Sequence, residues 1–161
     1  MHKIYARHTR TTMPDRLPIP LIKRSIKETL ALEGVDAPCE VSVLITDDLG
    51  IKKINSDFRG IDRPTDVLSF PMLDFSAPGW KNAKGAAADP ETSLLPLGEI
   101  VFSGERVHWQ ASAYGKSCEH ETAYLTVHSV LHLLGYDHAD ESDRKKQMRG
   151  REKIIMKKMG F

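Results

Sequence analysis

Hydrophobic and polar positions follow strand patterns in four short runs of the chain. These runs are rich in β-branched and other apolar residues, and turn residues separate them from their neighbours. The first run lies among basic and polar residues, which fits an edge strand. We therefore predict strands within residues 2–10 and at residues 41–46, 67–70 and 97–102, the third of them ending at Pro71.

Segments with helical periodicity lie between these runs. Hydrophobic residues recur at helical spacing over residues 19–34, where two prolines precede the repeat and a glycine closes it. Asp47 or Asp48 can cap a helix after the second strand. Ser103 can cap another after the fourth strand.

The sequence predicts a charged helix near the C-terminal end of the chain. Residues 140–159 have a narrow hydrophobic stripe, and their Lys and Arg residues form a solvated face by default and an RNA contact only secondarily. Together, these elements predict one α+β domain over residues 1–161, with helices packed on a mixed sheet of roughly four strands.

The segment between Pro71 and Pro96 is rich in Gly, Ala and Pro. Segments of this length and composition are usually disordered or act as lids. We expect residues 72–96 to form a flexible loop, with a lid or substrate-stacking role for Trp80 as the alternative.

A cluster of histidines carries the candidate chemistry. His128 and His132 lie four positions apart, one turn above each other on a helix. Gly135 ends that helix, and the chain then delivers His138. Three neutral imidazoles with a fourth direction left open form a catalytic zinc site. The HxxxHxxGxxH spacing predicts one Zn²⁺ ion per chain, although three imidazoles also suit other divalent transition metals.

The histidine helix is hydrophobic nearly all round, so it should be central and buried, with the metal facing a cleft in a zincin-like arrangement. Buried histidines need partners, and a metal supplies them. Two histidines at this spacing, without a third, have a simpler explanation, as a surface pair or as hydrogen-bonded core residues. Zinc peptidases have a Glu after the first histidine that acts as general base, and this chain has Ser129 there.

Composition limits the remaining possibilities. The net charge of +1 gives no global electrostatic attraction to nucleic acid or membrane, so local clusters must hold any anionic partner. Cys39 and Cys118 are isolated, which fits a reducing compartment. The chain has neither a signal-peptide pattern nor an apolar run of membrane-spanning length. We expect a cytoplasmic protein without a membrane partner.

Three stretches together resemble the YbeY family of bacterial endoribonucleases that process ribosomal RNA. Residues 128–138 match the pattern H-G-x-L-H-L-x-G-Y-D-H, with Ser129 in place of Gly. Residues 55–71 contain Arg59 and the run D-R-P-T-D-V-L-S-F-P, and residues 97–101 resemble an L-G-D-I strand. The stretches follow the family's order and span nearly the whole chain, although the Pro-bounded loop looks longer than usual.

The resemblance implies a single-strand-specific, metal-dependent endoribonuclease that matures the 3′ end of 16S rRNA and takes part in ribosome quality control. It implies zinc held by His128, His132 and His138, and catalytic roles for His128 and Arg59. It also implies ribosomal RNA, small-subunit ribosomal proteins and an assembly GTPase as partners.

Arg59 is a candidate phosphate clamp, because a guanidinium group offers parallel donors that match two phosphate oxygens. From the residues alone, an ion pair with Asp62 or Asp66 is an equal alternative, and the resemblance favours the phosphate role. Arg63, in the same loop, has a weaker case.

The general base is not evident. Glu121 shares the face of His128 two turns away, too far for direct contact with the metal, so a surface or supporting role is the default. Asp137 either orients a ligand imidazole or caps the turn. Attack by metal-bound water and attack by the RNA 2′-hydroxyl both stay open.

Two other functions fit part of the pattern. A zinc peptidase fits the histidine spacing, but the missing motif glutamate argues against it. A ribosome-assembly factor with a structural metal would need a fourth ligand, such as His108 or His120.

Overall fold

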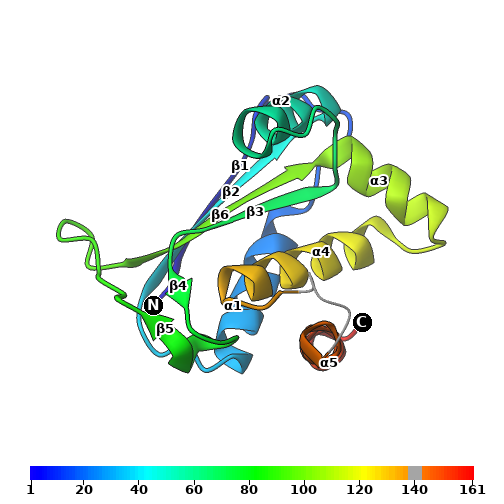
Figure 1. The fold of residues 1–161 in the computed structure, drawn as a ribbon. Helices are drawn as coiled ribbons and strands as arrows, with labels where there is room; N and C mark the ends of the chain where they lie inside the picture. The colour runs from blue at the N-terminus through cyan, green and yellow to red at the C-terminus, as the bar shows by residue number, and fades with distance from the viewer. Residues whose placement is uncertain (138–142) are drawn as a thin grey trace.

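A mixed four-stranded sheet forms the centre of the protein, described here from a computed structural model over residues 1–137 and 143–161. The strand order is β1-β2-β6-β3, in which β1, β2 and β6 are parallel and β3 is antiparallel to β6 (Figure 1). This arrangement confirms the predicted α+β class and the mixed sheet. The strands are β1 (Lys3–His8), β2 (Cys39–Thr46), β3 (Val67–Pro71) and β6 (Leu95–Ser103).

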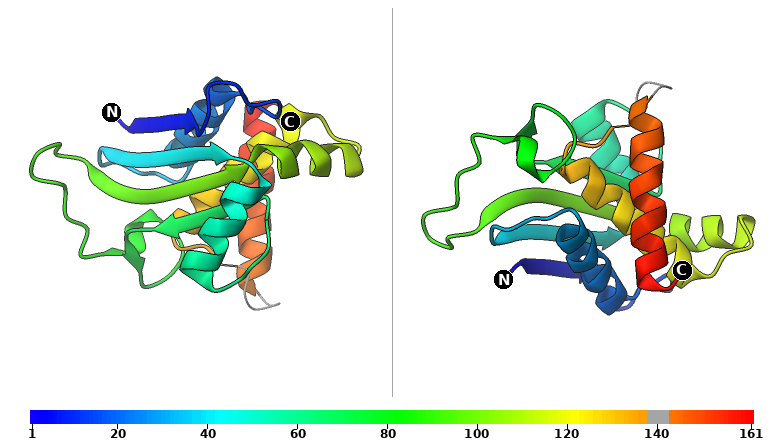
Figure 2. Two further views of the ribbon diagram at one scale, coloured as in Figure 1. Left: turned by 90° about the horizontal axis from the view of Figure 1, so that it is seen from above. Right: turned by 90° about the horizontal axis from the view of Figure 1, so that it is seen from below.

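Helices cover the two faces of the sheet unequally. Figure 1 shows α1 and α4 on one face and α2 near one end of the other face, while Figure 2 shows α5 crossing α4 on the side of α4 that faces away from the sheet. The fold therefore leaves part of one sheet face without a helix. The helices are α1 (Ile19–Leu32), α2 (Asp48–Arg59), α3 (Gly104–Ala113), α4 (Cys118–Leu133) and α5 (Asp143–Met159).

The helix starts follow the capping residues that the sequence predicts. The Asp47 side chain accepts a hydrogen bond of 2.8 Å from the backbone N–H of Gly50 at the start of α2. Ser103 accepts one of 3.2 Å from the N–H of Arg106 at the start of α3. Each cap satisfies a backbone donor that the first helical turn leaves without a partner.

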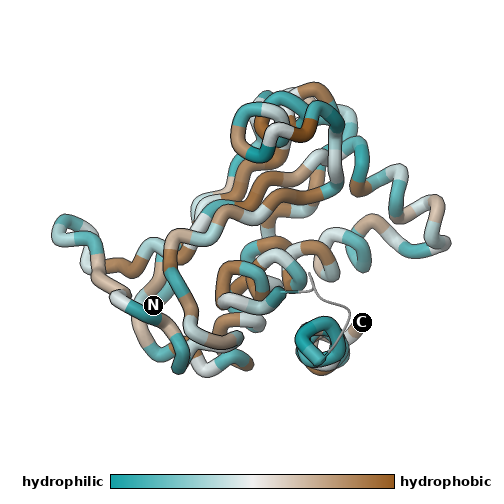
Figure 3. The backbone as a smooth tube through the Cα atoms, in the orientation of Figure 1, coloured by the Kyte–Doolittle hydropathy of each residue, from teal (hydrophilic) through white to brown (hydrophobic). Residues whose placement is uncertain are grey.

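The histidine helix α4 lies in the hydrophobic core, as predicted. Figure 3 shows hydrophobic positions along the strands and α4, whereas α5 is mainly hydrophilic. Gly98 of β6 allows a close approach: a Cβ atom there would lie 2.6 Å from Cδ2 of Leu133 and 2.5 Å from the carbonyl oxygen of Phe70. This contact sets the C-terminal half of α4 directly against the sheet.

Residues 72–96 contain a small second sheet. It pairs β4 (Asp74–Phe75) with β5 (Ala83–Lys84), and the 3₁₀ turn η1 (Trp80–Asn82) precedes β5. The indole N–H of Trp80 donates to Asp36 at 2.7 Å, so the side chain anchors the segment. The N–H of Gly79 also donates to the carbonyl oxygen of Leu134, at the end of α4, at 3.0 Å. The predicted flexibility of this segment stays a prediction.

Four large hydrophobic residues in and beside α2 and α3 are exposed. Leu49 and Phe58 of α2 are 78% and 74% exposed, and Trp109 and Tyr114, in and after α3, are also exposed. Both helices bury only a narrow side: in α2 it consists of Ile51 and Asn55. Among the described residues, no helix is long and apolar enough to cross a membrane.

Candidate active site

A cleft of about 760 Å³ opens between β3 and α4. The first two predicted histidines lie in it beside polar residues from three other parts of the chain. The cleft thus gathers residues that are up to 77 positions apart in the sequence. Its polar lining comprises Arg59 of α2, Asp66 before β3, Gln110 of α3, and Glu121, His128 and His132 of α4.

The rings of His128 and His132 face each other at the cleft. Their centroids are 4.6 Å apart with an interplanar angle of 85°, and their Nε2 atoms are 3.1 Å apart. The one-turn spacing on α4 explains this proximity, because residues four apart lie on the same helix face.

The other ring nitrogens have partners that determine the tautomers. Nδ1 of His132 lies 2.9 Å from the carbonyl oxygen of Tyr136, and Nδ1 of His128 lies 2.9 Å from Oε1 of Glu152. A carbonyl oxygen and a carboxylate only accept hydrogen bonds, so both Nδ1 atoms carry the hydrogen. In the neutral rings, both Nε2 atoms therefore present lone pairs.

Two lone pairs 3.1 Å apart repel each other unless a proton or a metal cation lies between them. Two nitrogen ligands on one tetrahedral zinc ion, each about 2.0–2.1 Å from the metal, lie roughly 3.3–3.4 Å apart. The separation and the tautomers therefore fit two ligands of one ion, with Glu152 and the Tyr136 carbonyl orienting the rings.

The third predicted ligand, His138, lies outside the described residues. Within residues 1–137 and 143–161, no three His, Cys, Asp or Glu side chains come together in a metal-binding group. The ligand set of three histidines stays a prediction, and so does the predicted role of Asp137 toward His138.

Glu152 carries a negative charge beside His128. Burial alone would raise the pKa of this carboxyl, but interactions with His128 and Tyr124 and the nearby charge of Arg149 outweigh it and lower the pKa. Burial and the adjacent Glu152 carboxylate both raise the pKa of Tyr124, whose ring stacks on His128 at 6.1 Å. A carboxylate and a protonated phenol therefore support the first histidine.

Arg59 is exposed at the C-terminal end of α2 and lines the same cleft as the histidines. Among the described residues it forms no ion pair, so the predicted alternative of a pair with Asp62 or Asp66 is wrong. Asp62 instead lies 3.9 Å from the ammonium group of Lys52. The guanidinium group of Arg59 is thus available to an anionic ligand in the cleft.

Two carboxylates on the cleft wall are linked through one amide. Nε2 of Gln110 donates to Asp66 at 3.1 Å and to Glu121 at 3.0 Å. Glu121 is buried and lies in the cleft with the histidines, so the default of a surface role is wrong, while a supporting role fits. Gln110 of α3 thus connects Asp66, before β3, to Glu121 of α4.

His108 and His120, the suggested closing ligands, do not reach the histidine pair. Nε2 of His108 lies 2.9 Å from the carbonyl oxygen of Arg16, and the ring of His120 packs edge-on against Phe161.

Ser129 is fully buried, and its hydroxyl has no hydrogen-bond partner among the described residues. Ser129 stands where zinc peptidases have their general-base glutamate, and its side chain is not part of the cleft lining.

Sequence reasoning missed Glu152, Gln110 and Asp66 as parts of the site. A signal existed for Glu152, because it occupies the hydrophobic stripe of α5 with Met148 and Ile155, where a charged residue needs a specific partner. Gln110 gives no such signal, since its role depends on how α3 packs against α4.

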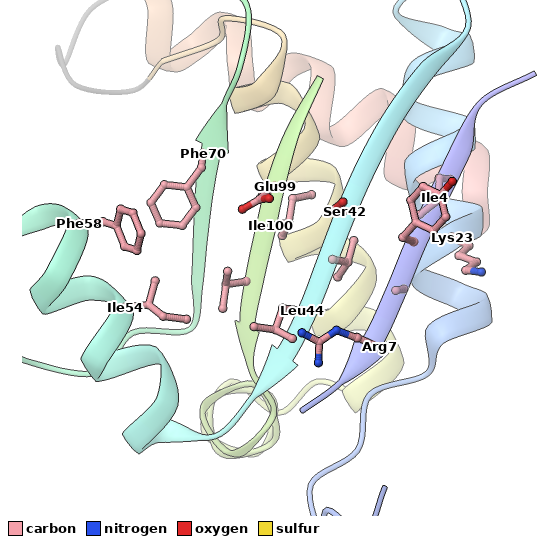
Figure 4. A pocket seen from close by; sticks show the side chains of 14 residues that line it. Ile4, Arg7, Lys23, Ser42, Leu44, Ile54, Phe58, Phe70, Glu99 and Ile100 are labelled. Carbon is pink, nitrogen blue, oxygen red and sulfur yellow. The ribbon is translucent and has the colours of Figure 1, made fainter. Parts of the chain in front are cut away.

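A second cavity, of about 720 Å³, lies on the sheet face away from α4. Figure 4 shows Phe58, Phe70, Ile54 and Leu44 beside it, with Arg7 and Lys23 at the far side. Its lining contains no histidine or cysteine. The histidine pair thus lies only in the cleft on the α4 side, which is the candidate active site.

Comparison with known proteins shows the family of this chain. The family described as endoribonuclease YbeY matches residues 4–160. The endoribonuclease YbeY of Caldanaerobacter subterraneus subsp. tengcongensis is 47% identical over 141 residues, which cover 88% of this chain and 87% of that protein. The endoribonuclease YbeY of Clostridium kluyveri is 48% identical over 143 residues, covering 86% and 87%.

The fold also matches a solved structure. A solution structure of a Thermotoga maritima protein superposes with a TM-score of 0.58 at 26% identity, covering 98% of this chain and 87% of that one. The sequence matches span most of both chains, and the family match over residues 4–160 includes every residue of this chain that lines the cleft. The chain belongs to the YbeY endoribonuclease family.

Proposed function

We propose that this protein is a metal-dependent endoribonuclease that cuts single-stranded RNA in the cleft between β3 and α4. The observation that carries the proposal is the pair of Nε2 atoms 3.1 Å apart, with both Nδ1 atoms bound to acceptors. Family membership supplies the reaction class, since the matched relatives are named endoribonucleases.

The proposed metal is one Zn²⁺ ion held by His128, His132 and His138. A zinc ion supplies Lewis-acid polarisation of a phosphoryl oxygen and lowers the pKa of bound water to about 7. Glu152 raises the basicity of His128 and fixes its ring, and the Tyr136 carbonyl does the same for His132.

Arg59 is the proposed phosphate-binding residue. It is exposed, lines the cleft and forms no ion pair among the described residues, so it can donate two parallel hydrogen bonds to a phosphodiester. Asp66 and Glu121 lie on the same wall and carry negative charge, which leaves Arg59 to offset their repulsion of RNA.

The proposed substrate is the 3′ region of 16S rRNA precursors, with a second role in ribosome quality control. Small-subunit ribosomal proteins and an assembly GTPase are the proposed partners, in the cytoplasm. These assignments follow from the resemblance of the histidine and Arg59 motifs to those of the family.

The test compares the purified protein with its His128→Ala variant on a single-stranded RNA, on the same RNA annealed to its complement, and on casein. We expect cleavage of the single strand only, and its loss in His128→Ala. Elemental analysis should find one zinc ion per wild-type chain. His108→Ala, which removes a histidine outside the cleft, is the matched control and should keep both zinc and activity.

Two results would overturn the proposal. Casein cleavage with intact RNA would identify a peptidase. Full rRNA maturation in cells by a folded His128→Ala protein would identify a non-catalytic assembly factor.

A further inference from the structure

A third cavity lies between α4 and α5, beyond the histidine cleft. Its volume is about 410 Å³, and residues of both helices line it. The lining comprises His120, Tyr124, Arg149, Glu152, Lys153 and Met156.

Two cations line this cavity without forming a salt bridge to any residue that the structure describes. Arg149 and Lys153 are one helical turn apart on α5, so their side chains extend on the same side of the helix. Both are exposed, and neither forms an ion pair among the described residues. The one acid in the lining, Glu152, is directed to His128.

His120 adds a polar group without a partner. Its Nδ1 is buried and makes no hydrogen bond among the described residues. The ring is held edge-on to Phe161, with centroids 5.6 Å apart. A ligand that carries negative charge would meet Arg149 and Lys153 together and lie beside the His120 ring, which lines the same cavity.

Tyr124 joins this cavity to the histidine cleft. It lines both cavities, and its ring stacks on His128 with an interplanar angle of 29°. A strand whose reacting phosphate lies at His128 can therefore continue past Tyr124 and reach Arg149.

We propose that Arg149, Lys153 and His120 form a subsite that binds a neighbouring backbone phosphate of the RNA. The inference rests on the proposed function, because a phosphate chain in the cleft is what makes a second phosphate site next to it useful. Phosphate contacts of this kind supply affinity and position without reading sequence.

The test replaces both cations in an Arg149→Ala/Lys153→Ala double variant. The control, Arg144→Ala/Lys158→Ala, removes the same charge from exposed positions that lie about 140–180° around α5 from Arg149. Melting temperature and zinc content check that each variant is folded. KM and kcat are measured on a single-stranded RNA of about 12 nucleotides.

We expect the KM of the double variant to rise about tenfold, with a smaller change in kcat, because the subsite binds away from the reacting phosphate. Binding of a DNA strand of the same sequence, followed by fluorescence anisotropy, should weaken similarly. The slope of log K against log salt should fall by about 0.7, the value for one single-strand phosphate. The control variant should match the wild type.

Equal effects in the double variant and the control would overturn the subsite, since they would reflect net charge alone. An unchanged KM and salt slope would overturn it as well. A wild-type protein that leaves RNA uncut would instead refute the proposed function, and the DNA-binding comparison would still decide whether the cations form a phosphate site.

Discussion

The Glu152 carboxylate lies 2.9 Å from Nδ1 of His128, so the last helix of the chain orients the first expected metal ligand. The two residues are 24 positions apart, and the contact exists only because α5 packs against α4. Metal-binding histidines usually hydrogen-bond a carboxylate or a carbonyl through the second ring nitrogen, and here both kinds of acceptor are present.

Replacing Glu152 with Gln should weaken metal binding by roughly 10- to 100-fold, because the neutral amide orients His128 less firmly and lowers its basicity. Competition with a chromogenic chelator measures the affinity. Glu119→Gln, an exposed change in the first turn of α4, removes the same charge and should leave the affinity unchanged. Equal affinity in Glu152→Gln and the wild type would show that Glu152 does not support a metal ligand.

Replacing Arg59 with Ala should slow RNA cleavage by about 10- to 100-fold, which corresponds to the loss of charged hydrogen bonds to phosphate. Zinc content should stay at the wild-type level, because Glu152 and the Tyr136 carbonyl, and not Arg59, hydrogen-bond the Nδ1 atoms of the two histidines. Arg63→Ala, an exposed change in the following loop, is the comparison. Loss of zinc from Arg59→Ala would indicate that the residue is structural.

Replacing Ser129 with Ala should raise the free energy of unfolding by about 1 kcal/mol, because it removes a buried hydroxyl without a partner. Urea denaturation of zinc-saturated protein measures the change. Ser112→Ala, at an exposed position of α3, measures the helix-propensity gain that any Ser-to-Ala change brings. A gain in Ser129→Ala no larger than in Ser112→Ala would mean that the hydroxyl costs nothing.

Gly135 connects the histidine helix to the second sheet. Its φ is +85°, and a Cβ atom there would lie 2.6 Å from Cβ of Phe75. Gly135→Ala should therefore lower the free energy of unfolding by about 1–3 kcal/mol and reduce zinc affinity. Gly150→Ala, in the interior of α5 with open space around it, should instead raise stability by up to about 1 kcal/mol. Stability losses of equal size in both variants would refute the role of Gly135.

The strands and helix starts followed from local sequence signals. Asp47 and Ser103 cap helices where their residue types predict caps, and β3 and β6 contain the predicted apolar runs. These features depend on residues a few positions apart, so periodicity and capping rules reach them.

The contacts that orient the site residues could not be predicted from local sequence signals. Contacts such as Gln110 with Asp66 and Glu121 join residues from different elements, and only tertiary packing sets them. The exposure of Phe58 has the same origin, since apolar spacing on α2 does not tell how much of the helix the sheet covers.

The most direct test of the account follows single-stranded RNA cleavage as zinc is restored to chelator-treated protein. The paired Nε2 atoms predict that cleavage is lost on chelation, returns in proportion to added zinc, and stops rising at one ion per chain. Full cleavage by protein that retains no metal would contradict it, because the two histidines would then face each other for another reason.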